Sequence, residues 1–529
     1  MELRLTDLAL SGESYVEAKG VTYFAHGGLP GERVRAHVID EREDGAARVA
    51  IDAVLEASPH RVTPPCPHAA VCGGCSLQHA AYAEQLRLKT ALVDGLLEDA
   101  FGPRRPRVSP MIGMPVDAGG SPRGFRQKAA FSFTEDTRGR LQLGHYARGT
   151  REVVPVTQCL VHSDRANRIA FAIRDAMAAH RIPVATERGG LLRHVVVRVT
   201  ADEREAVAVV VATEDHRALQ APLREVMRSK EKPEGLLLNL HDRDSPFLFG
   251  PHTLRVDGTG HVMEMALGPA FLSSPTGFFQ TNIRGAAQLV KLVTGAIGTG
   301  APLRVLDLYS GSGLFSLPLA LAGHRVTAVE ESRKASREAA KNARLSNVPE
   351  SHLRLRPSMV EEAIDHLVRQ TWDAAVIDPP RSGCPDDVMR TLTRRIAPRR
   401  LVIVSCNPEA LVDELRVAFG AGYRATLIQP VDMFPHTSHI ETVAVLESAG
   451  GSRPASRREG PEDLPRPPLK ARVDRATRPE ATPDRRSPPE KARWSTEEKE
   501  KKKAAKKFAK PWEAMYQGKA SRPPRKPRA

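Results

Sequence analysis

Hydrophobic and polar residues along this chain follow two different periods, and the change of period divides the chain into regions. In residues 1–59 the period is two, and glycine turns separate apolar runs at 3–10, 15–19, 21–25, 33–40 and 47–55. Short runs with this period are typical of β-strands. Five strands at this spacing predict a small OB-like β-barrel, an architecture that often binds oligonucleotides; a purely structural cap is the alternative.

Residues 60–270 mix both periods and predict an α+β domain. Strand-like runs lie at 125–133, 194–200, 206–213 and 236–240, and helical patterns lie at 163–180 and 219–229. The first of these runs alternates only in part, which is typical of an edge strand. On such a strand, Arg126 and Lys128 would lie on one face.

Residues 271–449 alternate apolar runs with amphipathic segments and predict a Rossmann-like α/β domain. We expect strands near 305–308, 325–330, 353, 372–377, 400–405, 424–430 and 440–446, and helices at 281–297, 332–345, 359–370, 386–396 and 409–419. Ligands of such sheets bind outside the carboxyl ends of the strands. Asp307, Glu330, Asp378 and Cys406 all stand at such ends, so we expect them to share one site.

A glycine turn follows the first strand of this domain. Gly311 and Gly313 form it, and the third glycine of the dinucleotide fingerprint is missing. Glu330 lies roughly 20 residues further on, where a carboxylate accepts both hydroxyls of a ribose. Acidic residues at successive strand ends suit a ligand with an amino acid at one end and a ribose at the other. These features favour S-adenosylmethionine; a turn that only joins strand to helix is the structural alternative.

The composition limits the class of protein. A chain of 529 residues predicts two or three domains. Its apolar runs are too short for a membrane span, and its start lacks the pattern of a signal peptide, so we expect a soluble cytoplasmic monomer. Six cysteines in such a chain favour metal binding or catalysis over a disulfide framework.

The positive charge of the chain is concentrated in its last 79 residues. From residue 451 onward there are 24 Lys and Arg against 11 Asp and Glu, whereas the whole chain has a net charge of +15. This Pro-, Arg- and Lys-rich tail, residues 450–529, has few apolar residues and predicts disorder. The piece 495–508 begins with a capping box and could become helical on a partner. We expect the tail to attract RNA electrostatically and to be dispensable for chemistry.

Three cysteines fall within ten residues. Cys66, Cys72 and Cys75 are separated partly by glycines, and Cys159 is available as a fourth ligand. Four thiolates suit either zinc or an iron–sulfur cluster. Zinc sites usually pair two short C-x-x-C units, whereas the spacing here is three plus one, which favours the cluster without excluding zinc.

Cys406 stands where a nucleophile would meet the bound ligands. A thiolate adds to electron-poor carbons, and C6 of uracil is such a carbon because it is conjugated to the C4 carbonyl. The addition makes C5 nucleophilic enough to take a methyl group from a sulfonium donor. A general base must then remove the C5 proton. Glu441 is the candidate, with His436 and His439 as rivals; an inert buried cysteine is the structural alternative.

Eight motifs together resemble the RNA uracil-5-methyltransferase family, specifically its iron–sulfur branch that modifies 23S ribosomal RNA. They occur in the family's order over residues 1–447: GLPGE (28–32), C-x5-C-G-G-C (66–75), FRQKA (125–129), FFQTN (278–282), DLYSGSG (307–313), DPPRSG (378–383), SCNP (405–408) and DMFPHTSHIE (432–441). Two positions depart from the usual pattern. Leu314 stands where relatives often have Asn or Thr, and Ser310 stands where Cys is frequent.

The resemblance implies roles for particular residues. The barrel would be a TRAM module, and Cys66, Cys72, Cys75 and Cys159 would hold a [4Fe–4S] cluster that positions RNA. The implied S-adenosylmethionine-binding positions are Gln280, Tyr309, Glu330 and Asp378, alongside the glycines of the turn. Cys406 would be the nucleophile and Glu441 the base. We further expect Phe278 to stack on a flipped uracil, and Arg126 and Lys128 to contact phosphates.

Three other functions compete with this interpretation. The same chemistry on tRNA is the strongest, because some cluster-bearing relatives act on tRNA. An amino-methylating enzyme would share the Asp-Pro-Pro motif but needs no nucleophilic cysteine, and Arg381 stands where such enzymes usually have an aromatic residue. A noncatalytic RNA-binding assembly factor would bind RNA without forming a methylated product.

Overall fold

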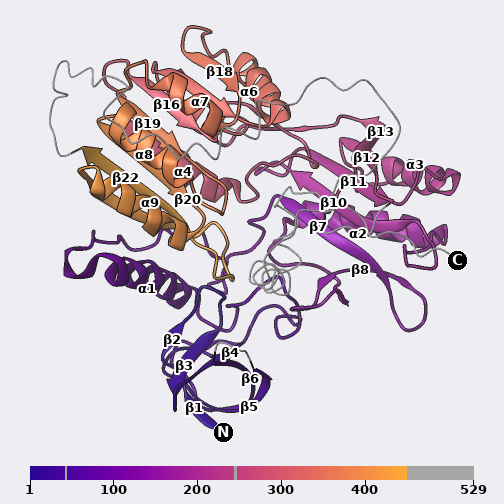
Figure 1. The fold of residues 1–529 in the computed structure, drawn as a ribbon. Coiled ribbons are helices and arrows are strands. Elements are labelled where there is room, and N and C mark those ends of the chain that lie inside the picture. Colours follow the sequence, from indigo (N-terminus) through magenta and orange to yellow (C-terminus); the bar gives the residue numbers. More distant parts are fainter. Residues whose placement is uncertain (42–44, 243–246, 449–529) are drawn as a thin grey trace, which may run out of the picture. The chain divides into compact units, whose positions relative to one another are not determined.

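Three large sheets organise the residues that the computed structural model describes, which are 1–41, 45–242 and 247–448 (Figure 1). The basic tail, with its predicted helical piece at 495–508, lies outside the described residues. Residues 1–449 cluster as one unit. In the described part of the chain, every helix is too short or too polar to cross a membrane.

The first sheet contains six strands, in the order β1-β5-β6-β4-β3-β2. They are β1 (Glu2–Arg4), β2 (Asp7–Leu8), β3 (Ser14–Ala18), β4 (Val21–Ala25), β5 (Arg33–Glu41) and β6 (Ala46–Glu56). The single strand predicted at 3–10 is therefore two strands, because the chain changes its partner between Leu5 and Thr6. The Leu5 N–H donates to Glu32, whereas the Thr6 N–H donates to Tyr15 on β3. Since β1 pairs with β5 and β2 pairs with β3, this segment joins both edges of the sheet and closes it.

The second sheet is mixed and has seven strands, in the order β13-β12-β11-β10-β7-β8-β9. Its elements are β7 (Lys128–Glu135), β8 (Leu141–Tyr146), β9 (Val153–Pro155), α2 (Asp164–Ala179), β10 (Leu192–Val199), β11 (Ala206–Ala212), a 3-10 turn (Arg217–Leu219), α3 (Gln220–Arg228), β12 (Gly235–Leu240) and β13 (His252–Gly258). The run predicted as an edge strand is β7, which lies in the interior between β10 and β8. Its alternation is incomplete because both of its faces contribute buried side chains.

The third sheet is the predicted α/β sheet, in the order β18-β17-β16-β19-β20-β22-β21. A two-stranded ribbon of β14 (Val262–Glu264) and β15 (Phe271–Ser273) precedes it. Its elements are α4 (Ile283–Ile297), β16 (Arg304–Leu308), α5 (Ser316–Leu321), β17 (Arg325–Glu330), α6 (Arg333–Leu345), β18 (Leu353–Pro357), α7 (Val360–Leu367), β19 (Ala374–Ile377), α8 (Asp386–Arg390) continuing as a π-helix (Thr391–Ile396), β20 (Arg400–Ser405), α9 (Pro408–Gly420), β21 (Tyr423–Val431) and β22 (Glu441–Ser448).

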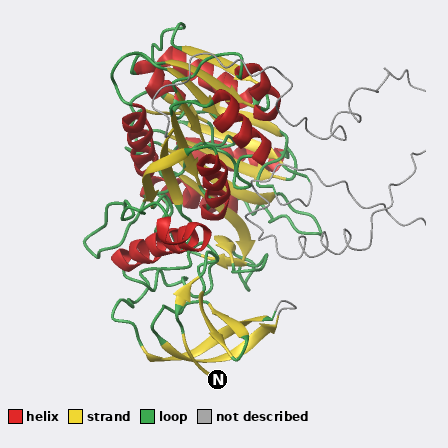
Figure 2. Ribbon diagram, turned by 60° about the vertical axis from the view of Figure 1, so that its left-hand side comes forward, coloured by secondary structure: helices red, strands yellow, loops and turns green. Residues whose placement is uncertain are grey.

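Helices cover both faces of the third sheet (Figure 2), which explains why its strands have apolar residues on both sides. On β20, Leu401 and Ile403 belong to the core on the α8 and α9 side, whereas Val402 and Val404 belong to the core on the α4 and α5 side. The antiparallel β22 is also apolar on both faces. The strands run outward in sequence from β16 to β18 on one side, and the chain then returns to place β19 on the other side of β16. The parallel strands β16 and β19 are therefore neighbours with their carboxyl ends side by side at this switch point.

A long helix from outside the predicted α/β region also packs on this sheet. Helix α1 (Tyr82–Phe101), followed by a 3-10 turn (Gly102–Arg104), contributes Val93 and Leu97 to the core that contains α9. The segment after it adds bridges to β21, between Val108 and Ile428 and between Ile112 and Val431. Residues 82–112 therefore cover one face and one edge of the third sheet.

Candidate active site at the carboxyl edge of the third sheet

The turn after β16 has a backbone conformation that favours glycine. Tyr309, Gly311 and Gly313 all have positive φ angles, of 61°, 56° and 95°. A Cβ atom at position 313 would lie 2.1 Å from Leu317 Cδ1, which is buried in the core, so a side chain there would collide. A Cβ atom at position 311 would meet open space. The turn therefore combines a close approach to α5 with room for a ligand above Gly311.

Glu330 and Asp307 flank this turn. The Glu330 carboxylate accepts the Gly311 N–H at 2.9 Å and the Ser332 N–H at 2.8 Å, which fixes its position at the end of β17. Asp307 is fully buried and accepts a hydrogen bond from the Ser316 hydroxyl through Oδ2. Its Oδ1 atom has no hydrogen-bond partner among the described residues. Burial and the nearby Glu330 raise the pKa of Asp307 to about 7.

Cys406 and Glu441 lie at the end of the ladder that joins two neighbouring strands. Ser405, the last residue of β20, pairs with Thr442 of β22, so Cys406 directly follows the paired stretch and Glu441 directly precedes Thr442. The Glu441 carboxylate and the Cys406 thiol are close enough to interact electrostatically. Asp378, at the end of β19, is the third member, because it interacts electrostatically with both residues. The structure thus brings the predicted nucleophile and base together.

The charges around Cys406 resist its ionisation. Burial raises the pKa of the thiol to about 12, and the Glu441 and Asp378 carboxylates add to this shift, whereas the Arg381 guanidinium opposes it. Burial also raises the pKa of Glu441 to about 7, again against Arg381, and raises that of Asp378 well above its usual range. Arg381 is held in place through its carbonyl, which accepts the Asn407 side-chain amide at 3.0 Å. The site therefore favours the neutral thiol of Cys406 and protonated forms of the carboxyl groups beside it. The Arg381 guanidinium is the nearby cation that favours the thiolate.

A loop before α4 carries the predicted aromatic and polar residues. Phe278 is 73% exposed, so its ring is free to contact a ligand outside the protein. The carbonyl of Gln280 accepts a hydrogen bond from buried Arg198, and this contact anchors the loop to β10. Asn282 is not directed at a ligand: it caps α4 by accepting the Gly285 N–H at 3.0 Å and donates to the carbonyl of Met433.

The two cations predicted for phosphate contacts lie at the start of β7. Lys128 Nζ donates to the carbonyl of Gly277 at 3.2 Å and lies 5.4 Å from the centre of the Phe249 ring. Burial, together with the nearby Arg198 and Arg126, lowers the pKa of Lys128 to about 7. Arg126 lies just before β7, and its Nε atom is buried without a hydrogen-bond partner among the described residues. Lys128 thus lies against the loop that carries Phe278, and burial leaves its amine only partly protonated near neutral pH.

The four predicted ligand cysteines form one neighbourhood. All four are partly buried free thiols, and Cys75 interacts electrostatically with Cys66, Cys72 and Cys159. Burial raises the pKa of Cys75 to about 12 and that of Cys159 to about 11, so these thiols would be neutral without a bound cation. Arg148, which follows β8, donates to the carbonyls of Cys72 and Cys75. Soft donors near one another in a partly buried loop fit a metal or an iron–sulfur cluster.

Sequence analysis did not single out two histidines next to this loop. His145 on β8 and His162 lie with Cys159 so that their ligand atoms are within 4.8 Å of one another. Burial lowers the pKa of His145 to about 4 and that of His162 well below its usual value, which keeps both rings neutral. Their places in the sequence, on a hairpin strand and three residues after a cysteine, are a signal only once the fold is known.

The side chain of Cys384 lies beside the glycine turn, in contact with Tyr309. The Tyr309 hydroxyl lies 3.7 Å from Cys384 Sγ and 3.5 Å from Glu361, so the ring bridges β16 to α7 and to the turn after Asp378. Leu314, the departure noted above, packs into the apolar core beside α5 and is buried. Its buried side chain gives it no polar contact with a ligand in the turn.

Known proteins resemble this chain in sequence. A family model described as tRNA (uracil-5-)-methyltransferase matches residues 270–449. An uncharacterised RNA methyltransferase of Caldanaerobacter subterraneus subsp. tengcongensis is 34% identical, over 84% of this chain and 97% of its own length. Another from Gloeobacter violaceus is 32% identical, over 84% and 95%.

A similar fold occurs in a solved structure. The tRNA (uracil-54, C5)-methyltransferase of Pyrococcus abyssi, crystallised with S-adenosyl-L-homocysteine, aligns with a TM-score of 0.67 over 84% of this chain and 100% of its own. The two sequences are 23% identical, so this likeness concerns the fold.

Proposed function

Because the chain belongs to the RNA uracil-5-methyltransferase family, and is therefore an S-adenosylmethionine-dependent RNA methyltransferase, we propose that its target is C5 of a uridine in 23S ribosomal RNA. The single observation that carries the C5 chemistry is that Cys406, directly after β20, lies close to Glu441 at the start of β22 and to Asp378. A methyltransferase acting on an amino group has no use for this pair. The ribosomal target is proposed from the cluster-type cysteine motif of the sequence.

S-adenosylmethionine, which supplies an electrophilic methyl group, would bind at the carboxyl edge of the third sheet. Glu330 is fixed by two backbone N–H groups, one on each carboxylate oxygen, and each oxygen keeps a lone pair with which it could accept a ribose hydroxyl; Asp307 offers an unpartnered buried oxygen near the turn. The proposed binding residues are Gln280, Tyr309, Gly311, Gly313, Glu330 and Asp378. Open space above Gly311 supports this assignment.

The covalent steps are divided between two side chains. Cys406 gives its proton to solvent, and its sulfur bonds to C6 of the uracil, so that the C5–C6 electron pair becomes an enolate at C5. C5 then takes the methyl group as the bond from methyl to the sulfonium sulfur breaks, and C5 still carries its own proton. The Glu441 carboxylate removes that proton, and the electron pair reforms the C5–C6 bond as the bond from sulfur to C6 breaks. A base with a pKa of about 7 suits proton removal near neutral pH.

Several surfaces would hold the RNA. Phe278, which is exposed, is proposed to stack on the flipped uracil, and Arg126 and Lys128 are proposed to stabilise nearby phosphates. The closed N-terminal sheet is proposed to be a TRAM module that binds RNA. Cys66, Cys72, Cys75 and Cys159 are proposed to hold a [4Fe–4S] cluster that positions RNA and does not exchange electrons with it. The protein is proposed to act as a cytoplasmic monomer.

Two variants test the covalent mechanism. Cys406→Ala should abolish formation of 5-methyluridine while S-adenosylmethionine binding, measured by calorimetry, stays within about twofold. Glu441→Gln should accumulate a protein–RNA adduct that survives denaturing electrophoresis, because methylation precedes the blocked proton removal. Turnover by the alanine variant would remove the thiol from the mechanism, and free RNA with the glutamine variant would count against the base.

The identity of the metal group has its own test. Anaerobically purified protein should contain iron and sulfide at about four each per chain. If the protein instead contains one zinc ion per chain, the four cysteines form a zinc site and not an iron–sulfur cluster.

Mass mapping decides between the candidate RNAs. Ribosomal and transfer RNA from a deletion strain, with and without this gene, should differ by 5-methyluridine in 23S ribosomal RNA. A difference confined to tRNA would favour the alternative substrate, and RNA binding with no methylated product would favour an assembly factor.

A further inference from the structure

The segment that ends at the proposed base is held by the loop that carries the cysteines. This segment, residues 432–440, joins β21 to β22 and is called here the base connection. Its carbonyl at His436 accepts two hydrogen bonds, from the N–H of Ser76 at 2.8 Å and of Leu77 at 2.9 Å. Ser76 directly follows Cys75. The cysteine loop is thus hydrogen-bonded to His436, which lies five residues before Glu441 in the chain.

His436 has a strained and fully specified position. It is buried, and its φ angle of 66° lies in the left-handed region that a histidine rarely adopts. Its ring Nε2 lies 3.0 Å from the carbonyl of Pro122, which can only accept, so Nε2 carries the proton. Nδ1 then accepts the amide of Gln85 at 3.3 Å, and the oxygen of the same amide accepts the His436 N–H at 2.9 Å. Both polar ends of the residue are therefore satisfied from α1 and from residue 122.

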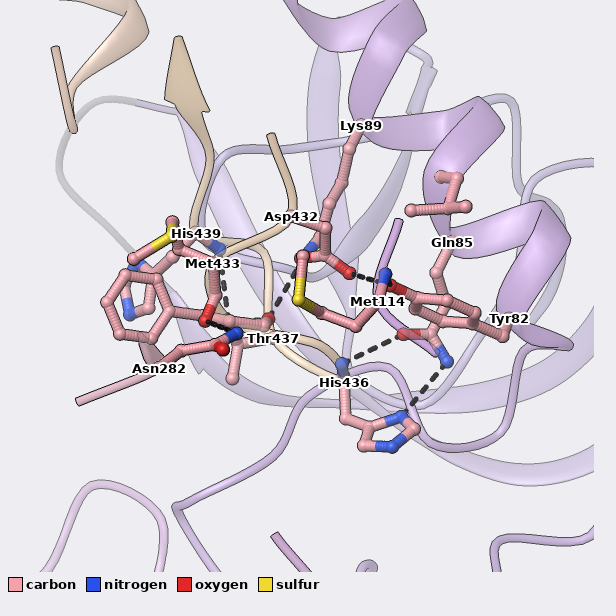
Figure 3. A network of polar contacts seen from close by, with 12 residues as sticks. Tyr82, Gln85, Lys89, Met114, Asn282, Asp432, Met433, His436, Thr437 and His439 are labelled. Carbon is pink, nitrogen blue, oxygen red and sulfur yellow. Dashed lines mark hydrogen bonds and ion pairs between the residues drawn. The ribbon is translucent and has the colours of Figure 1, made fainter. Parts of the chain in front are cut away.

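The rest of the base connection is anchored in the same way (Figure 3). Before His436, the buried pair of Lys89 and Asp432 is 2.6 Å long, and Lys89 also donates to the carbonyl of Phe434. After it, the Ser438 hydroxyl donates to the carbonyl of Leu10 in the N-terminal sheet. A small cavity beside Cys75 is lined in part by residues 434, 435 and 437. This segment is thus tied to α1, to the cysteine loop, to the turn between β2 and β3 and, through Asn282 and Met433, to the start of α4.

We propose that His436 is a positioning residue through which α1 and the cysteine loop set the place of Glu441. This inference rests on the proposed function, because it assigns Glu441 the removal of the C5 proton. His436 is buried, and both of its ring nitrogens contact protein groups. Its role follows from geometry: β22 begins five residues later, and a displacement of the base by about 1 Å costs on the order of a hundredfold in rate. Loss of the bound metal group would loosen Ser76 and Leu77, and so would act on proton removal as well as on RNA binding.

Gln85→Leu is the variant that removes this contact. Leucine fills a similar volume on α1 and removes both hydrogen bonds to His436, together with the Gln85 hydrogen bond to the carbonyl of Ala80, while it leaves the cysteines and Glu441 intact. We expect kcat to fall at least tenfold with KM for RNA within about twofold. Methylated protein–RNA adduct should accumulate, because addition and methyl transfer continue while proton removal slows. His436→Asn keeps a residue that tolerates the left-handed φ and should retain more activity than His436→Val, which does not.

His324→Asn is the matched control. His324 is equally buried, lies 2.8 Å from the carbonyl of Gly298 through Nε2 and accepts the Leu303 N–H, but at the amino-terminal edge of the same sheet. Its loss should lower the melting temperature without any accumulation of adduct. If Gln85→Leu and His324→Asn lose kcat in the same proportion to their loss of melting temperature, and neither accumulates adduct, His436 has only a structural role and the proposal is wrong.

Hydrogen–deuterium exchange without RNA separates this proposal from the proposed function. Gln85→Leu, and separately Cys75→Ser, should speed exchange of amides in residues 433–442 at least fivefold, while amides of β16 and α4 keep their rates. Unchanged exchange in 433–442 would overturn the link between loop and base connection even in an active enzyme. Failure of the proposed function would instead appear in the wild-type protein, as RNA without 5-methyluridine, and would leave the exchange result standing.

Discussion

At the scale of single residues, Glu441 places a carboxyl group where charge is disfavoured. Burial raises its pKa from 4.5 to about 7, although the Arg381 guanidinium opposes the shift. The folded protein therefore binds a proton there more tightly than the unfolded chain does, so stability falls as the pH rises. The loss accumulates between pH 4.5 and about 7 and is complete above that, where it amounts to about 3 kcal/mol.

Glu441→Gln should remove this dependence. Relative to the wild type, the variant should gain about 3 kcal/mol in free energy of unfolding between pH 4.5 and pH 7, measured by urea denaturation over that range. Glu56→Gln in the first sheet is the control: Arg4 and Arg33 hold the pKa of Glu56 below its usual value, so its ionisation changes stability only below about pH 4.5, and this variant should show no added pH dependence between pH 4.5 and pH 7. A constant difference between wild type and Glu441→Gln over this range would contradict the raised pKa.

At the scale of elements, helix α1 is stapled to the base connection by a buried ion pair. Lys89 and Asp432 are both fully shielded from solvent, and the Tyr82 hydroxyl donates to the second oxygen of Asp432 at 2.8 Å. Removing one member of such a pair leaves an uncompensated buried charge and costs about 3–5 kcal/mol. Replacing both members by neutral residues of similar shape costs much less.

Lys89→Met should therefore lower the free energy of unfolding by about 3–5 kcal/mol, and adding Asp432→Asn should recover most of the loss. Asparagine still accepts from Tyr82 through its oxygen. Arg416→Met on α9 is the control: Arg416 and its partner Asp413, three residues earlier on the helix, are both exposed, so its loss should cost less than about 1 kcal/mol. Chemical denaturation of the four proteins decides the matter, and equal losses for Lys89→Met and the double variant would count against the ion pair as the cause.

The same helix shows why some elements escape sequence analysis. Its buried face contains Glu84, Gln85 and Lys89 among the apolar residues, so the apolar stripe is interrupted, and Ala81 offers no capping side chain. Gln85 and Lys89 face inward because their partners come from residues 432–436, about 350 positions away in the chain, whereas Glu84 pairs with Arg87 on the same helix. By contrast, α4 has Asn282 as a cap and an unbroken stripe, and its predicted place was confirmed.

At the scale of the whole molecule, the site at the sheet edge was predictable because strand order is simple in α/β domains. Asp307, Glu330, Asp378 and Cys406 each follow an apolar run, and parallel strands bring their carboxyl ends to one edge. The position of Glu441 depends on β22 being antiparallel, which the pattern of a closing hairpin indicated. The pairing of His145 and His162 with Cys159 was not predictable, because only tertiary packing brings His145 on β8 close to the other two residues.

The charge distribution of the whole chain predicts a division of labour between the residues before and after 450. The segment 450–529 holds 24 of the 78 basic residues and a net charge of +13, whereas every proposed site residue lies before it. A chain that ends at residue 449 should therefore keep its kcat on saturating RNA within about twofold. Its affinity for RNA should fall and depend less on salt, because each phosphate that the tail neutralises adds about 0.7–0.9 to the slope of log K against log salt concentration. Filter binding from 50 to 300 mM salt should give a slope smaller by at least about one unit.

A tail of the same length with Gln at every Lys and Arg is the control, and it should behave like the truncated chain. If it instead binds RNA like the wild type, the tail acts through its shape or sequence and not through its charge.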